Sequence, residues 1–274
     1  MVSTFANVIS DVHTLGDIPW WAAIVGSTLA LRASLAVVNI NSMANGARMR
    51  AIQPYMFMLR KQVEAAQASG NQDAMIESSK QLRGFMKEHG VSPLRMLLAP
   101  VLNIPFSLLF FWALQSLCKD AALIEGFSVG GTLWFEDLGA PDPYAVIPIM
   151  SAVFSLASIQ LSASLQNNDQ SFFGYSQDSV RNFMRGMAVL FGVVSASFPV
   201  GLTLSFASTS AVMLTTNLLV RTSPIQRLFG FPEGYPTDIK PVLPPGLSDE
   251  EAEALVAASK AAQQSAMSQN PFEK

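Results

Sequence analysis

The chain has 274 residues, of which 50% are hydrophobic and 14% are charged, and its formal net charge is −3. Soluble domains carry about 25% charged residues, so this composition indicates a membrane protein. Cys118 is the single cysteine and the two histidines lie far apart in the sequence, which excludes an intrachain disulfide and a metal centre built from cysteine or histidine.

The first apolar stretch runs from Ile18 to Asn39 and is long enough to cross a bilayer, since a spanning helix needs about 20 apolar residues. Arg32 is its single charge and lies roughly 21 Å along the helix from Ile18. Placing an arginine inside a span costs roughly 2.5 to 3.5 kcal/mol, so such a residue indicates a functional site. The alternative is that the guanidinium snorkels to the nearer interface.

Four further stretches are predicted to span the membrane: residues 95–118, 143–163, 183–198 and 200–220. Prolines inside the second and third need neighbouring helices to satisfy the carbonyls that they free, which predicts a packed bundle. The predicted fold is therefore an all-α polytopic membrane protein with five transmembrane helices. Residues 1–17 are predicted to form an outer tail, 18–221 the five-helix core, and 222–274 an inner tail that is Pro-rich and acidic.

The basic residues predict the orientation of these spans. Of the 17 Lys and Arg residues of the chain, Arg32 lies inside the first predicted span and Lys119 lies on one side of the membrane. The other fifteen lie on the opposite side, in the loops, at the boundaries of the spans and in the carboxyl-terminal tail. Because loops rich in Lys and Arg stay on the inner side, we expect the amino terminus outside and the carboxyl terminus inside.

The loop between the first two spans, about residues 43–90, is predicted to form a helical hairpin on the inner face. Apolar residues from Met49 to Ala66 recur at steps of three and four, a weaker repeat continues from Met75 to His89, and Ser69-Gly70-Asn71 marks a turn between them. The apolar stripe is interpreted as the seam of the hairpin. The basic outer face is the candidate contact surface, with Arg48, Arg50, Arg60, Lys61, Lys80, Arg83 and Lys87.

Catalytic chemistry is not predicted. The string Gly126-Phe127-Ser128-Val129-Gly130 matches a nucleophile elbow, but it lacks the strand before it and the helix after it that this motif requires. In the tail, Ser248 and Glu251 form a capping box that predicts an Ala-rich helix to about Gln269. The net charge of residues 222–274 is negative, so sequence-specific nucleic-acid binding is not expected there.

The segment from Leu133 to Met150, LWFEDLGAPDPYAVIPIM, resembles the outer loop and third span of the YidC/Oxa/Alb membrane insertases. A W-F-x-D-L-x-x-x-D-P element of this kind recurs in the mitochondrial Oxa branch. Three further stretches are similar to the family: the arginine of the first span followed by a basic run to Ala47-Arg48-Met49, then Lys87 to Phe106, which contains Gly-Val-Ser-Pro, and Phe198 to Arg221, which resembles the last hairpin. The tail departs from the basic coiled coil of the Oxa branch, so ribosome docking through the tail is not carried over.

The resemblance implies five spans around a hydrophilic groove that is open to lipid and to the inner side. Arg32 matches the groove arginine of the family, and no cofactor is implied. The partners implied are client membrane proteins and the lipid bilayer, with the ribosome as a further candidate through the inner loops. Other polar residues could line the groove or make interhelical hydrogen bonds instead: Asn39, Gln115, Gln160, Thr215 and Asn217.

The function expected from this resemblance is that of a membrane protein insertase, not an enzyme, in the mitochondrial inner membrane. The amino terminus is then in the intermembrane space and the carboxyl terminus in the matrix. Two other functions stay open, a non-inserting assembly subunit of a larger membrane complex and a small-solute channel or carrier. The bacterial inner membrane and the thylakoid are the alternative locations.

Overall fold

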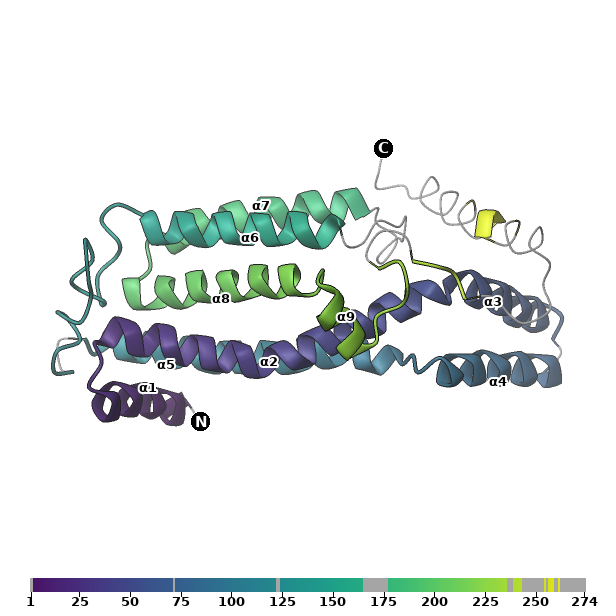
Figure 1. Ribbon diagram of the computed structural model, residues 1–274, viewed down its shortest axis with the longest axis horizontal. Coiled ribbons are helices and arrows are strands. Elements are labelled where there is room, and N and C mark those ends of the chain that lie inside the picture. Colours follow the sequence, from purple (N-terminus) through teal and green to yellow (C-terminus); the bar gives the residue numbers. More distant parts are fainter. Residues whose placement is uncertain are drawn as a thin grey trace. The chain divides into compact units, whose positions relative to one another are not determined.

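The computed structural model describes residues 2–70, 72–121, 124–164, 177–235, 239–242 and a few positions between 254 and 261. These residues are predominantly helical (Figure 1). Their helices are α1 (Val2–Gly16), α2 (Trp20–Ala51), α3 (Gln53–Ala68), α4 (Gln72–Glu88), α5 (Pro93–Lys119), α6 (Val146–Ser164), α7 (Gln177–Ser195), α8 (Val200–Leu219) and α9 (Ser223–Phe229). The predicted cap at Ser248 and most of the tail helix after it lie outside the described residues.

The chain divides into two compact units. The first contains residues 1–39, 98–162 and 183–220, and the second contains residues 40–97, 163–182 and 221–274. Helices α2 and α5 therefore contribute residues to both units.

Three of the described helices, α2, α5 and α8, are long and apolar enough to cross a membrane. The apolar part of α6 is shorter, Val146–Ser162. Helix α7 begins at Gln177 and ends at Ser195, whereas the sequence predicted a span over 183–198. Its first turns carry Arg181 and Arg185, which lower its apolar content.

Residues 2–16 form the helix α1, where the sequence predicted only a tail. Phe5, Ile9 and Val12 recur at steps of four and three and therefore lie on one face of this helix. Ile9 is fully buried, and the Phe5 ring meets Phe106 of α5 edge-on with 6.3 Å between ring centroids. The amphipathic face of α1 thus packs along the side of α5 (Figure 1).

Helix α2 continues twelve residues beyond Asn39, so the hairpin begins at Gln53 and not near residue 43. The boundary is at Ile52, directly before the first turn of α3, which holds Pro54. Proline has no amide hydrogen to donate to the carbonyl four residues earlier, which explains why the helix breaks there.

Helices α3 and α4 pack against each other in the second unit. Ile52 and Met56 are buried in a cluster that also contains Val91, with Leu82 and Phe85 of α4 packed against it. The cluster thus buries the seam between the two helices.

The segment after α8 is held by two arginines of α2 within the second unit. Arg48 donates from Nε to the Gly230 carbonyl oxygen at 2.7 Å and from Nη2 to that of Phe229, so it caps the end of α9. The Arg50 guanidinium carbon lies 5.7 Å from the centre of the Tyr235 ring, and burial raises the pKa of that phenol above its usual value. Val242 donates its amide to Ala51 and adds to the apolar cluster of the hairpin.

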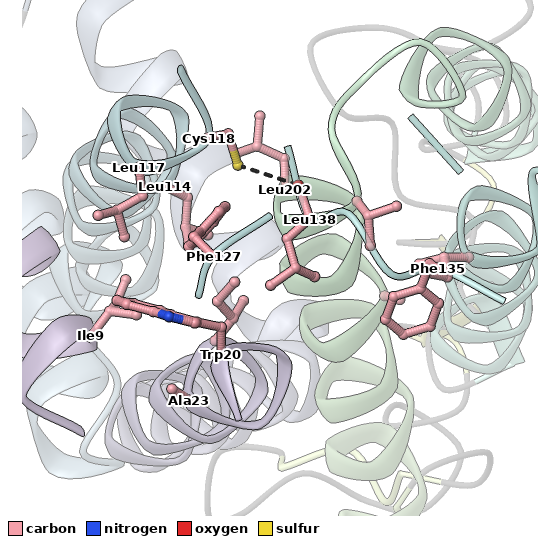
Figure 2. Close-up of a cluster of buried hydrophobic side chains, with 14 of the residues drawn as sticks. Ile9, Trp20, Ala23, Leu114, Leu117, Cys118, Phe127, Phe135, Leu138 and Leu202 are labelled. Atoms are coloured by element: carbon pink, nitrogen blue, oxygen red, sulfur yellow. Dashed lines mark hydrogen bonds between the residues drawn. The ribbon is translucent and has the colours of Figure 1, made fainter. Parts of the chain in front are cut away.

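The loop after α5 folds into an apolar cap on the first unit. Figure 2 shows Trp20 and Phe127 beside Leu114 and Leu138, and the structure buries all four almost completely. The Trp20 indole donates to the Glu125 carbonyl oxygen at 3.2 Å, and the Trp21 amide donates to that of Gly130 at 3.1 Å. This end of the helix bundle is therefore filled by tightly packed side chains.

Candidate functional site

Arg32 projects from α2 toward α5 and α8 and is half-buried. Its Nε donates to the Thr209 hydroxyl of α8 at 3.1 Å, and its Nη1 donates to the Ser107 hydroxyl of α5 at 3.0 Å. A guanidinium has five N–H groups, so these two bonds leave three for other acceptors. The two hydroxyls thus hold Arg32 in place, and its other N–H groups can still donate to a further acceptor.

The position of this contact is close to the middle of the three apolar helices. Arg32 follows Trp20 by about 18 Å of helix, Ser107 precedes Lys119 by about 18 Å, and Thr209 follows Val200 by about 14 Å at the usual helical rise. The hydrocarbon core of a bilayer is about 30 Å thick. A charge at this depth is an unusual feature of an apolar bundle.

No carboxylate pairs with Arg32 in the part of the chain that the structure describes. The sequences of α2, α5, α6 and α8 contain neither Asp nor Glu. Neutral hydroxyls orient the guanidinium but leave its positive charge uncompensated. The site is therefore suited to attract a carboxylate that comes from outside the chain.

A second polar contact joins α2 to α5 on the same faces. The Asn103 side-chain amide donates to the Asn39 side-chain carbonyl oxygen at 2.7 Å and to the Ala99 backbone. Asn39 lies seven residues after Arg32 and Asn103 four residues before Ser107, spacings that repeat one face of a helix. The pairs Arg32–Ser107 and Asn39–Asn103 thus form a polar track between α2 and α5.

Asn217 belongs to a different contact, the packing seam between α6 and α8. Its side-chain amide donates to the hydroxyls of Ser158 at 2.8 Å and Ser162 at 2.9 Å, and it is 4% exposed. Further along this seam Ser155 and Ser210 share a hydrogen bond at 2.9 Å. Small hydroxyl residues in such a row allow two helices to approach closely.

The other predicted groove residues do not contact Arg32. Gln160 of α6 accepts a hydrogen bond from Arg185 of α7. Thr215 is exposed and donates its hydroxyl to the Ala211 carbonyl of its own helix. Gln115 is half-buried near the end of α5 that precedes the apolar cap.

The basic residues predicted for the hairpin contact surface divide into two groups. Arg48 and Arg50 of α2 are occupied by the segment after α8. The remaining five are exposed on α3 and α4: Arg60, Lys61, Lys80, Arg83 and Lys87.

Ser107 and Thr209 were not among the residues predicted from the sequence, and neither was Asn103. A usable signal was present for α5, since Asn103 and Ser107 are four residues apart in an otherwise apolar segment and must share a face. For Thr209 no such signal exists, because α8 carries hydroxyl residues on several faces.

Comparison with known proteins identifies a family and several relatives of this chain. The family described as 60Kd inner membrane protein matches residues 12–226. Mitochondrial inner membrane protein oxa1-2 of Schizosaccharomyces pombe is 26% identical over 83% of the chain and 54% of its own length. Cytochrome c oxidase assembly protein COX18, mitochondrial, of Homo sapiens is 30% identical over 82% of the chain and 72% of its own length. Mitochondrial inner membrane protein OXA1 of Arabidopsis thaliana is 23% identical over 85% of the chain and 52% of its own length.

The chain spans about half the length of the Oxa relatives and a larger share of the human assembly protein. The family match covers most of the chain and includes α2, α5 and α8 in full, with Arg32, Ser107 and Thr209. The chain belongs to the family of the 60Kd inner membrane protein, the YidC/Oxa/Alb family that its motifs resemble.

Proposed function

We propose that this protein is a membrane protein insertase and that Arg32 is a transient binding site, called the foothold below, for acidic residues of its clients. The observation that carries the proposal is the uncompensated guanidinium held by Ser107 and Thr209 at mid-depth of three apolar helices. An acidic residue in a translocated client tail pairs with this charge for part of its passage. A bidentate arginine–carboxylate pair is among the stronger polar contacts, and it is reversible.

The proposed mechanism lowers the cost of moving a polar tail across the bilayer. A polar track that reaches from Arg32 to Asn39 shortens the distance that a client crosses in hydrocarbon. Apolar client helices then leave sideways into lipid, where they gain the favourable burial of apolar surface. This process makes no covalent bond and consumes no nucleotide.

The proposal places five spans in the membrane, with α6 and α7 added to α2, α5 and α8. Support comes from the long exposed apolar side chains on α7, among them Phe183 at 64% and Val193 at 68% exposure, and on α6, including Val153 at 54%. Large apolar patches on a surface are suited to lipid contact. The amino terminus is then outside, and the hairpin of α3 and α4 and the carboxyl terminus are inside.

We place the protein in the mitochondrial inner membrane, as the names of its relatives indicate for those proteins. Its partners are then client membrane proteins and the surrounding lipid, and the ribosome is a candidate partner for the exposed basic residues of the hairpin. A second function is favoured by the similarity to a cytochrome c oxidase assembly protein. In that case the chain handles a narrow set of clients during assembly of one complex.

The test is a depletion-and-rescue assay that scores export of the amino-terminal tail of a membrane client. Cells without the protein receive wild type, Arg32→Ala or Arg32→Lys, with Arg227→Ala as a control because Arg227 is an exposed arginine on α9. We expect wild type and the control to restore export, Arg32→Lys to restore it in part and Arg32→Ala to fail although the protein accumulates. Full rescue by Arg32→Ala would refute the foothold. Rescue of cytochrome c oxidase subunits alone would favour the assembly function.

A further inference from the structure

A basic hollow of about 320 Å³ lies where α4 turns into α5, within the second unit. Three cationic side chains line it, Arg83 and Lys87 from α4 and Arg95 from the first turn of α5. The remaining lining residues are Met86, Gly90, Val91 and Ser92. The function proposed for Arg32 does not use this hollow.

The backbone turn that forms the hollow is held from several sides. Gly90 adopts a left-handed backbone with φ of 64°, and the Val91 amide donates to the Met86 carbonyl at 2.9 Å, which closes the end of α4. Val91 is 5% exposed and sits in the apolar cluster of the hairpin. Asn45 of α2 donates to the Ser92 carbonyl at 2.8 Å and accepts from its amide at 3.1 Å.

The charges around this hollow repel one another. Arg83 and Lys87 are four residues apart on a helix, a spacing at which like charges destabilise by a few tenths of a kcal/mol. Arg95 stands in the first turn of α5, where the helix dipole disfavours a cation and no acidic residue is present. Within the described residues none of the three pairs with a carboxylate. Arg95 donates to the Gly90 carbonyl oxygen at 3.5 Å, which leaves its charge uncompensated, and an anion in the hollow would relieve the repulsion between the three cations.

We propose that this hollow binds the phosphate headgroup of an anionic phospholipid. The lipid source is favoured by exposed apolar side chains in the first turns of α5, which also hold Arg95: Leu94 is 77% and Leu97 57% exposed, and their spacing of three residues places them on one face of the helix. When the headgroup of the phospholipid occupies the hollow, the acyl chains of the same lipid can lie along these leucines. The proposal rests on the placement of α5 in the bilayer under the proposed function, but it requires no client.

The experiment uses the purified full-length protein and native mass spectrometry with phosphatidylglycerol or phosphatidylcholine added at equal concentration. One variant carries Arg83→Gln, Lys87→Gln and Arg95→Gln. The matched control carries Arg60→Gln, Lys61→Gln and Lys80→Gln, which removes the same charge from exposed positions of the same hairpin outside the hollow. The single variant Arg83→Gln is a milder test that replaces one exposed side chain.

We expect wild type and the control to retain phosphatidylglycerol over phosphatidylcholine, and the affinity to fall about fivefold for each hollow charge removed. An equal loss in the two triple variants, or no loss in either, would overturn the proposal. Inorganic phosphate and a short RNA duplex are titrated separately, and binding of either as tight as the lipid would reassign the site. Arg32→Ala should bind lipid like wild type, which separates this result from a failure of the insertase proposal.

Discussion

Arg32 is oriented by two hydroxyl groups and not by an acid, and this choice of partner matters for its chemistry. A carboxylate at the position of Ser107 or Thr209 would neutralise the guanidinium and compete with a client for it. The Ser107 and Thr209 hydroxyls each accept one hydrogen bond from Arg32 and, being neutral, leave its charge intact. Hydrogen bonds to charged groups contribute roughly 1.5 to 3 kcal/mol, enough to hold the side chain away from the interface.

We therefore expect the double variant Ser107→Ala with Thr209→Val to lower client export about tenfold, with each single change lowering it less. Without these acceptors the flexible arginine snorkels toward the aqueous phase and leaves the track. The readout is the same export assay, normalised to the amount of protein that accumulates. Ser116→Ala is the control, since it removes an exposed hydroxyl near the end of α5. Wild-type export by the double variant would mean that Arg32 needs no positioning.

Asn217 gives the opposite expectation. Its hydrogen bonds to Ser158 and Ser162 are buried in the α6–α8 seam, so Asn217→Leu removes packing contacts and no groove surface. Interhelical hydrogen bonds in membranes average about 0.6 kcal/mol and reach about 1.7. We expect the variant to lower the free energy of unfolding of the detergent-solubilised protein by about 0.6 to 1.7 kcal/mol, seen as a lower midpoint of thermal unfolding. Export per folded molecule should not change. A selective loss of export at normal stability would place Asn217 in the groove instead.

The sequence identified Arg32 because a lone charge in an apolar segment is conspicuous, whereas its partners were not identified. Hydroxyl residues are common in spans and bond to their own helix, as Thr215 does here. Which hydroxyl faces Arg32 depends on the rotation of α5 and α8 about their axes. That rotation is set by packing over the whole bundle and cannot be obtained from one helix alone.

At the scale of elements, the apolar cap at the start of α2 depends on glycine. A Cβ on Gly131 would lie 1.9 Å from the Phe135 carbonyl oxygen, and one on Gly130 would lie 2.7 Å from Trp20 Cβ. Side chains do not fit at these distances without moving the backbone. The tight turn after residue 129 therefore requires its two glycines.

Gly131→Ala is expected to destabilise the protein by at least about 2 kcal/mol, the range typical of severe core strain. The matched control is Gly84→Ala on α4, where a Cβ meets no atom within 4 Å. Because glycine costs roughly 0.5 to 1 kcal/mol in a helix interior relative to alanine, the control should be neutral or stabilising. Thermal unfolding of both variants in detergent provides the comparison. Similar unfolding midpoints for the two variants would show that the apolar cap accommodates an added methyl group at residue 131.

The elements with clear chemical boundaries could be predicted from the sequence. The predicted end of the inner loop near residue 90 coincides with Gly90 after α4, and the predicted break between residues 198 and 200 coincides with Pro199 before α8. Helix α1 was missed because its apolar face is short and becomes meaningful only when α5 covers it. The extension of α2 to Ala51 was missed because its polar second half contacts other segments of the second unit, including Ser92 and Gly230.

At the scale of the membrane-spanning bundle, the two ends of the first unit differ in chemistry. The end at the start of α2 is closed by buried Trp20, Phe127 and Leu138 (Figure 2). From Arg32 in the opposite direction along α2, the helix meets α5 through Asn39 and Asn103. A polar track that stops beneath an apolar cap suits a one-sided groove, whereas a channel needs polar residues at both ends.

This asymmetry predicts which positions water-soluble reagents reach from each side of the membrane. In a Cys118→Ser background, Asn103→Cys and Thr209→Cys should react with a membrane-impermeant maleimide added to inverted vesicles, in which the inner face of the membrane is exposed to the medium. The same two variants should not react in right-side-out vesicles, in which the outer face is exposed. Thr28→Cys should react from neither side, because Thr28 lies one turn from Arg32 toward the cap and is 1% exposed. Labelling of Thr209→Cys from the outer side would show a continuous aqueous path and favour a channel. Absence of labelling at both Asn103→Cys and Thr209→Cys would mean that Arg32 is dry, and the foothold mechanism would then lose its water-filled route for the client.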